Sequence, residues 1–160
     1  MKIGIFGNYM RLHLTFKNIV DNPKCRIYIN QQLLAEGTVE PSYEFNIDLD
    51  AVECCLRIDH WDKNPSDTIV ENGKIIRDRS FELEKIIIDG YDLQELIWQS
   101  SFVSSNSERY ESCLFFGPNG SFELSFHLPI LHWILSNRNE SGWEEDYNHY
   151  QTACQLLKQI

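Results

Sequence analysis

The chain has 160 residues, of which 42% are apolar or aromatic, and this composition suits one folded domain with a sizeable core. Its 14 Lys and Arg residues stand against 24 Asp and Glu residues, so the net charge is −10, which disfavours nucleic acid and anionic membranes as partners. No apolar stretch approaches the roughly 18 residues of a membrane span. The opening residues make too short a run for a signal peptide.

Alternation of apolar and polar residues dominates the chain and predicts strands. Over residues 10–17, Met10, Leu12 and Leu14 share one face and polar residues the other, which is typical of a half-buried strand. Similar short runs predict further strands at residues 26–30, 43–48, 56–60, 67–71, 74–77, 84–89, 113–116 and 121–128.

Turn residues indicate how these strands connect. Asn72-Gly73 is a strong hairpin signal between two apolar runs, and Asn119-Gly120 predicts a second hairpin. The serine-rich residues 100–107 are expected to form a loop. A short helix is expected over residues 92–98, and the apolar run 129–135 fits either a buried helix or a strand.

Many short strands without long intervening helices favour an all-β fold, an antiparallel, jelly-roll-like β-sandwich over residues 1–140. Ser141 and Glu144 form a capping-box pattern that opens a C-terminal amphipathic helix over residues 141–160. We expect this helix to pack on its own sandwich or to dock on a neighbouring subunit. Its apolar stripe comprises Trp143, Tyr147, Tyr150, Cys154 and Leu157.

The cysteines show no metal or redox motif. They are odd in number and irregularly spaced, and no C-x-x-C pair occurs. We expect reduced, mostly buried thiols in a reducing compartment. The residues concerned are Cys25, Cys54, Cys55, Cys113 and Cys154.

One catalytic hypothesis comes from His60-Trp61-Asp62. An H-x-D at a strand end, with a later histidine, is the ligand pattern of iron(II) oxygenases. His127 or His132 would supply the third ligand, and Arg138 would pair with a co-substrate carboxylate. The alternative is a structural histidine at a solvated strand end. No nucleophile motif such as G-x-S-x-G is present.

No cofactor is expected from the sequence, and acidic residues at predicted turns raise calcium as the alternative. Calcium takes six to eight oxygen ligands, and the glycine of Asp89-Gly90-Tyr91-Asp92 would let a carbonyl turn toward an ion. In a chain of this charge, solvated acidic loops are the alternative. The carboxylates are Asp59, Asp62, Asp67, Asp78, Asp89 and Asp92.

Aromatic residues in turn-rich sequence predict a binding patch. Tyr91, Trp98 and Tyr110 lie in turn or loop segments, with Asp89 and Asp92 close in sequence. Aromatic rings can stack on the apolar face of a sugar while carboxylates and amides read its hydroxyls. We therefore predict that these five residues form a sugar- or partner-facing site.

The runs 56–63, 67–79 and 86–93, with the later 117–126 and 129–133, carry a resemblance. They are similar to small proteins of T4-like marine phages, especially cyanophages, which look like the jelly-roll sandwiches of calcium-dependent, xylan-type carbohydrate-binding modules. The resemblance spans roughly residues 50–135 and transfers no binding residue.

The resemblance implies a non-enzymatic binding or assembly module of a virion, such as an attachment, tail, neck or capsid-decoration component. Its expected partners are other virion proteins or a host-surface glycan, in a homo-oligomer or multi-copy assembly. The alternatives are a phage protein that inhibits a host protein in the host cytoplasm, and the oxygenase built on His60 and Asp62.

Overall fold

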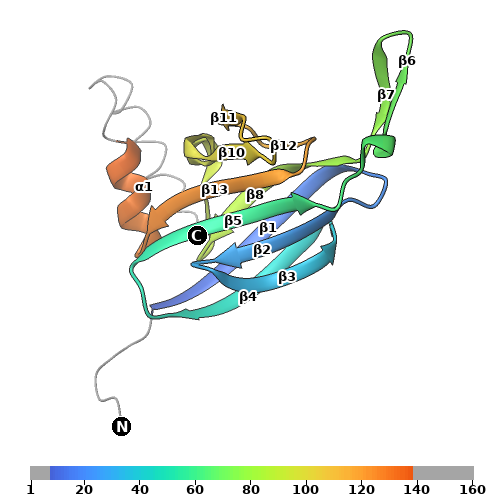
Figure 1. Ribbon diagram of the computed structural model, residues 1–160. Helices are drawn as coiled ribbons and strands as arrows, with labels where there is room; N and C mark the ends of the chain where they lie inside the picture. Colours follow the sequence, from blue (N-terminus) through green and yellow to red (C-terminus); the bar gives the residue numbers. More distant parts are fainter. Residues whose placement is uncertain (1–7, 139–160) are drawn as a thin grey trace.

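The structure is a computed structural model that describes residues 8–138, and it confirms the predicted antiparallel β-sandwich. Two sheets, here called sheet A and sheet B, face each other across the core (Figure 1). All strand pairs are antiparallel, and the chain passes repeatedly from one sheet to the other, as in jelly rolls. The expected helix over residues 141–160 lies outside the described residues.

Sheet A has five strands in the order β12–β8–β1–β4, with β9 also paired to β8. Its central strand β1 pairs with β4 and β8, and Leu12 lies opposite both Phe45 and Ile88. Because the predicted alternation holds, the side chains of Met10, Leu12 and Leu14 are buried. The strands are β1 (Asn8–Val20), β4 (Ser42–Leu49), β8 (Ser80–Ile88), β9 (Tyr91–Asp92) and β12 (Phe115–Phe116).

Sheet B has six strands in the order β11–β10–β13–β5–β2–β3. Leu56 and Ile58 of β5 are fully buried, between Ile27 and Ile29 of β2 and Phe122 and Leu124 of β13. The strands are β2 (Lys24–Ile29), β3 (Gln32–Thr38), β5 (Glu53–Trp61), β10 (Ser101–Ser104), β11 (Arg109–Glu111) and β13 (Gly120–His127).

A separate hairpin, β6 (Thr68–Glu71) and β7 (Lys74–Asp78), projects beyond the sandwich (Figure 1). The predicted Asn72-Gly73 turn is confirmed, because both residues have positive φ, 53° and 76°, as a type I′ turn requires. A 3₁₀ helix of one turn, η1 (Pro65–Asp67), leads into this hairpin.

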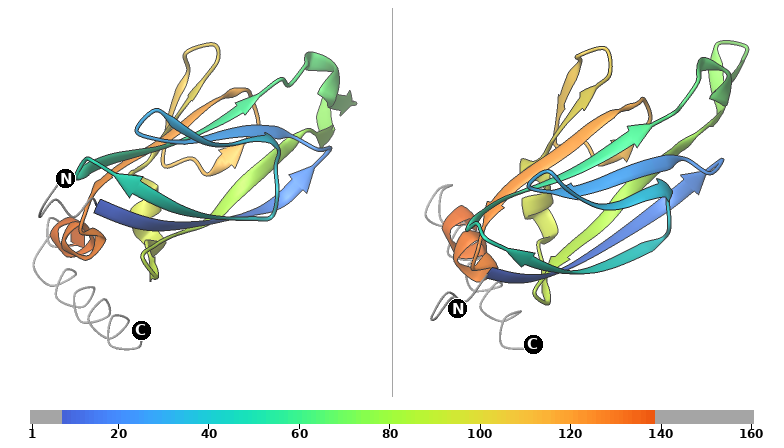
Figure 2. Two further views of the ribbon diagram at one scale, coloured as in Figure 1. Left: turned by 90° about the horizontal axis from the view of Figure 1, so that it is seen from below. Right: turned by 60° about the horizontal axis from the view of Figure 1, so that its bottom comes forward.

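Two helical segments cover parts of the sandwich. The expected helix over residues 92–98 is the 3₁₀ helix η2 (Gln94–Gln99), and the apolar run 129–135 lies in helix α1 (Ile130–Arg138). Trp133 of α1 packs edge-on against Phe126 of β13, at the end of the sandwich away from the β6–β7 hairpin (Figure 2). No helix in residues 8–138 is long and apolar enough to cross a membrane.

A cluster of phenylalanines fills the core between the sheets. Phe81 stacks on Phe116 with ring centroids 4.4 Å apart, and Phe116 contacts the rings of Phe102 and Phe122. These four side chains are at most 1% exposed. Phe81 and Phe116 come from strands of sheet A and Phe102 and Phe122 from strands of sheet B, so this cluster joins the two sheets.

Two local predictions were wrong, and one strand was not predicted. The expected loop 100–107 contains strand β10, whose alternate residue Phe102 is buried. Asn119-Gly120 does not close a hairpin, because β12 joins sheet A while β13 joins sheet B. Gly120 is needed for close packing instead: a Cβ there would lie 2.4 Å from the Val103 carbonyl oxygen. Strand β3 was not predicted, because the Asn30-Gln31 turn before it lacks glycine.

Candidate functional site

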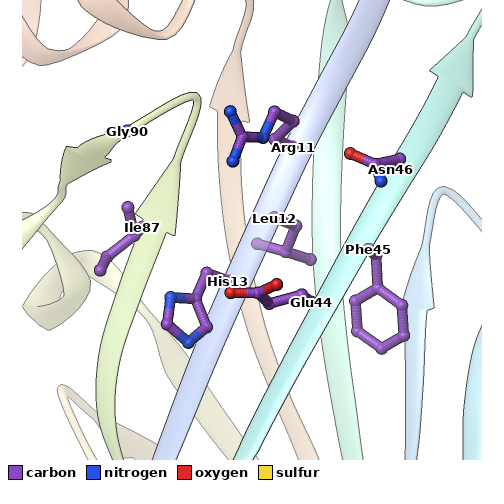
Figure 3. Close-up of a pocket in the computed structure, with 8 residues that line it drawn as sticks. All are labelled: Arg11, Leu12, His13, Glu44, Phe45, Asn46, Ile87 and Gly90. Atoms are coloured by element: carbon purple, nitrogen blue, oxygen red, sulfur yellow. The ribbon is translucent and has the colours of Figure 1, made fainter.

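The outward face of sheet A carries a hollow of about 480 Å³, here called the trough (Figure 3). It lies over the middle of β1 and extends onto β4 and β8. Its volume falls within the range of small-molecule sites, roughly 300–1,000 Å³. The lining residues are Arg11, Leu12, His13, Glu44, Phe45, Asn46, Ile87 and Gly90.

Strand register brings the polar lining together. On β1 the outward residues alternate with the buried ones, and Arg11 lies opposite Asn46 while His13 lies opposite Glu44. On the other side of β1, His13 lies opposite Ile87 of β8. Residues directly opposite each other project to the same face of a sheet, so three strands contribute to one surface.

The trough combines hydrogen-bond donors, acceptors and groups that can do both. The guanidinium of Arg11 only donates, the carboxylate of Glu44 accepts when ionised, and the amide of Asn46 does both. The imidazole Nε2 of His13 lies 2.9 Å from the hydroxyl of Ser42. The lining therefore suits a ligand with many hydroxyl groups.

The β8–β9 hairpin forms one end of the trough, and two predicted site residues belong to it. Asp89 and Gly90 make the turn, with φ of 51° and 85°. The carboxylate of Asp89 accepts the backbone N–H of Arg11 at 2.8 Å, and that of Asp92 accepts the backbone N–H of Gln94 at 2.9 Å. Both carboxylates thus hold local backbone next to the trough.

The predicted aromatic residues lie on three different segments. Tyr91, on β9, is half-buried and packs against the core. Trp98 on η2 is 51% exposed and Tyr110 on β11 is 42% exposed. Ser112, two residues beyond Tyr110, donates its hydroxyl to the Trp98 carbonyl, which ties these two segments together. The binding patch itself stays a prediction.

Aromatic rings on the outward face of sheet B are already covered by cations. The guanidinium carbon of Arg26 lies 3.8 Å from the ring centroid of Trp61, and the Lys24 ammonium lies 5.3 Å from it. Arg57 lies 4.1 Å from the ring centroid of Tyr28. These cations compete with a sugar for stacking on the ring faces that they cover.

The iron-site hypothesis is wrong, because its ligands do not meet. His60 is buried, and its Nδ1 lies 3.1 Å from the carbonyl oxygen of Pro118. A carbonyl only accepts, so Nδ1 carries the proton and donates this bond. Burial lowers the pKa of His60 to about 4. Asp62 instead forms a 2.9 Å ion pair with Lys24.

The other proposed ligands lie elsewhere. His60 pairs with Gly120 and His127 pairs with Glu53, so seven strand positions, about 23 Å, separate the two histidines. His132 is on α1, beyond the end of β13. Arg138 pairs with Glu95 of η2, not with a residue near His60. A co-substrate site at His60 therefore lacks both the third ligand and the arginine.

The carboxylates proposed as calcium ligands do not form a cluster. Within residues 8–138, no three His, Cys, Asp or Glu side chains are placed to hold a metal ion. Each predicted carboxylate already has a protein partner. Asp59 pairs with Arg57, Asp62 with Lys24, Asp67 with Arg79 and Asp78 with Lys63, while Asp89 and Asp92 accept the backbone N–H groups of Arg11 and Gln94.

The cysteines within residues 8–138 are free thiols, as expected. Burial raises the pKa of Cys25 and of Cys54 to about 11, so both thiols stay protonated near neutral pH. Cys55 and Cys113 are partly exposed. Burial also raises the pKa of Cys55.

Comparison with known proteins gives a faint structural likeness. No known protein family and no curated protein matches the sequence. One solved structure, a selenomethionine form of vCBM60 described in connection with two families of calcium-dependent carbohydrate binding modules, has a TM-score of 0.48 and 10% identity over 71% of this chain and 88% of that chain.

A second solved structure is vCBM60 in complex with galactobiose. It has a TM-score of 0.41 and 11% identity, over 72% of this chain and 96% of that chain. At this level of similarity neither structure bears on what this chain binds, and the candidate site rests on the geometry of the trough alone.

Proposed function

We propose that the protein is a non-enzymatic β-sandwich module that binds a saccharide in the trough. The observation that carries the proposal is the meeting of Arg11, His13, Glu44 and Asn46 around one open hollow. Sugar hydroxyls both donate and accept hydrogen bonds, and this lining offers partners for both roles. Ile87 adds an apolar side chain beside them.

The lining supports binding rather than hydrolysis of a glycan. Glycoside hydrolysis uses a pair of Asp or Glu side chains on either side of the scissile bond. The eight lining residues include one carboxylate, that of Glu44. Rigid strands hold the side chains, which suits a preformed binding surface.

Asn46→Ala should weaken saccharide binding roughly 2- to 10-fold, because one or two neutral hydrogen bonds to a sugar hydroxyl are lost. Asn46 is exposed and its loss should leave stability unchanged. A glycan array identifies the ligand, and calorimetry then compares the variant with wild type.

Ser125→Ala, an exposed change on sheet B, is the matched control and should bind normally. Each titration is run with and without calcium, since calcium dependence is part of the sequence-based hypothesis. If Trp98→Ala abolishes binding while Asn46→Ala does not, the site is the predicted aromatic patch rather than the trough. Binding by no glycan would refute the saccharide proposal.

We also propose an assembly role for the β6–β7 hairpin, in which a second copy of the chain is the partner. Four aliphatic side chains of this hairpin are 44–64% exposed, and such exposed apolar groups commonly mark interaction sites. They are Ile69, Val70, Ile75 and Ile76.

Charge favours the hairpin as the contact between copies. Within the hairpin, residues 68–78, two basic residues and two acidic ones give a net charge of 0 (2 − 2), whereas the whole chain carries −10. Two acidic copies therefore repel each other less at this element than the charge of the whole chain implies.

The double variant Ile75→Thr/Ile76→Thr should shift the protein from oligomer to monomer in sedimentation velocity experiments, because the exposed apolar surface is reduced. Leu33→Thr, at another exposed aliphatic position on β3, should leave the oligomer intact. Wild-type protein that is monomeric at every concentration would rule out this contact.

A place in the virion is the setting that the sequence resemblance suggests for both roles. Mass spectrometry of purified particles tests it, since a virion component must be present at a fixed copy number. A protein found only in infected cells would favour the alternative role as an inhibitor of a host protein.

A further inference from the structure

The chain has seven arginines, all within residues 8–138, and Arg11 differs from the other six. The other six each form an ion pair with a carboxylate: Arg26 with Glu36, Arg57 with Asp59, Arg77 with Asp21, Arg79 with Asp67, Arg109 with Glu111 and Arg138 with Glu95. Within the described residues, the guanidinium of Arg11 has no ion pair, hydrogen bond or ring contact. Only its backbone N–H is engaged, by Asp89.

This exception stands out because carboxylates outnumber basic residues, 24 to 14. The guanidinium of Arg11 lines the trough, and Figure 3 shows it toward the Gly90 side, while the carboxylate of Glu44 lies beside His13. Within the described residues, the trough therefore contains an unneutralised planar cation, and His13 and Asn46 contribute hydrogen-bond groups to the same lining.

We infer that the saccharide bound in the trough carries a carboxylate, as a uronic acid does, and that Arg11 binds this carboxylate. This inference rests on the proposed saccharide-binding function. A guanidinium presents two parallel N–H donors that match the two oxygens of a carboxylate, and such bidentate pairs are among the strong hydrogen bonds of proteins. Glu44 and Asn46 are then left to contact hydroxyl groups.

The charge of the whole protein makes Arg11 decisive for such a ligand. A net charge of −10 repels an anionic saccharide, and Glu44 in the trough adds to the repulsion. Attraction must therefore come from a local cation, and Arg11 is the lining residue that carries a permanent positive charge.

The test titrates trigalacturonate, its fully methyl-esterified form and neutral galactobiose by calorimetry in calcium-free buffer. We expect trigalacturonate to bind most tightly. Arg11→Gln should weaken its binding roughly 10- to 100-fold, since a charge-assisted bidentate contact is lost, and should weaken binding of the two neutral saccharides only about 2- to 5-fold, since the glutamine amide can still donate to a hydroxyl group.

Arg26→Gln is the matched control, because Arg26 is already paired with Glu36 on sheet B, and it should bind all three saccharides normally. Arg11→Lys should restore only part of the affinity, since an ammonium lacks the planar fork. Inorganic sulfate and free galacturonate are compared as competitors of trigalacturonate. If sulfate displaces trigalacturonate as well as free galacturonate does, the site binds any anion and the inference is overturned.

The failure of this inference can be told apart from failure of the proposed function. If neutral saccharides bind as tightly as trigalacturonate, or if Arg11→Gln weakens all three equally, the carboxylate inference is overturned and the saccharide site remains. If no saccharide binds, the proposed function is overturned and the inference with it. Melting temperatures of the variants verify that each one is folded.

Discussion

Replacing Phe81 by alanine should lower the free energy of unfolding by about 3–5 kcal/mol, the usual cost of removing a buried phenylalanine ring. Phe81 is 0% exposed, stacks on Phe116 at 4.4 Å, and contacts Phe16 and His60 edge-on. The cavity would open between the two sheets, where neighbouring rings cannot collapse without moving a strand. Urea unfolding monitored by tryptophan fluorescence measures the loss.

Phe115→Ala is the matched control for this prediction. Phe115 is the residue before Phe116 on β12, yet its ring is 46% exposed. Its removal should change the free energy of unfolding by about 0.5 kcal/mol or less. A loss below about 1 kcal/mol for Phe81→Ala, or equal losses for the two variants, would contradict the packing described for the phenylalanine cluster.

Acidification from pH 7.5 to pH 5 should cost the protein about 2 kcal/mol of stability through His60 alone. Burial is the main cause that lowers the pKa of His60 from 6.5 to about 4 in the folded protein, and the nearby Lys63 adds to it. As the pH falls below 6.5, the unfolded chain takes up a proton that the folded protein does not, so the unfolded state gains stability. The loss therefore begins near pH 6.5 and is complete below about pH 4.

His60→Gln removes this titration while keeping an amide that can donate to the Pro118 carbonyl. Between pH 7.5 and pH 5, the free energy of unfolding of this variant should fall by about 2 kcal/mol less than that of wild type. Urea unfolding at each pH measures both values. His132→Gln changes an exposed histidine on α1 and should keep the wild-type pH dependence. Identical pH profiles for wild type and His60→Gln would contradict the buried, neutral state of His60.

Local patterns predicted much of the fold. The alternation at residues 10–17 correctly identified the buried face of β1, and Asn72-Gly73 correctly located the β6–β7 turn. Strand β10 was missed because its serines mimic a loop, and only its partner β13 makes it a strand. The hairpin predicted at Asn119-Gly120 was wrong because Asn-Gly signals a turn locally, whereas here the chain passes from sheet A to sheet B.

The site was harder to predict than the fold. Arg11 and His13 were recognised only as the polar face of one strand, because the residues that complete the trough lie about thirty and seventy-five residues further along the chain. The H-x-D pattern at His60 gave a false signal, since its histidine is turned into the core and its aspartate is paired with Lys24. Which arginines form ion pairs with carboxylates also becomes visible only in the folded structure.

The sequence by itself determined the fold class, the strand faces and the acidic surface, because these depend on side-chain period and composition, which are local properties. Tertiary structure decided which strands became neighbours, which carboxylates were neutralised and which arginine has no ion pair within residues 8–138. These depend on sheet order and register, which are set by packing between residues far apart in the chain. A binding surface assembled from β1, β4 and β8 therefore appears only once the sheet has formed.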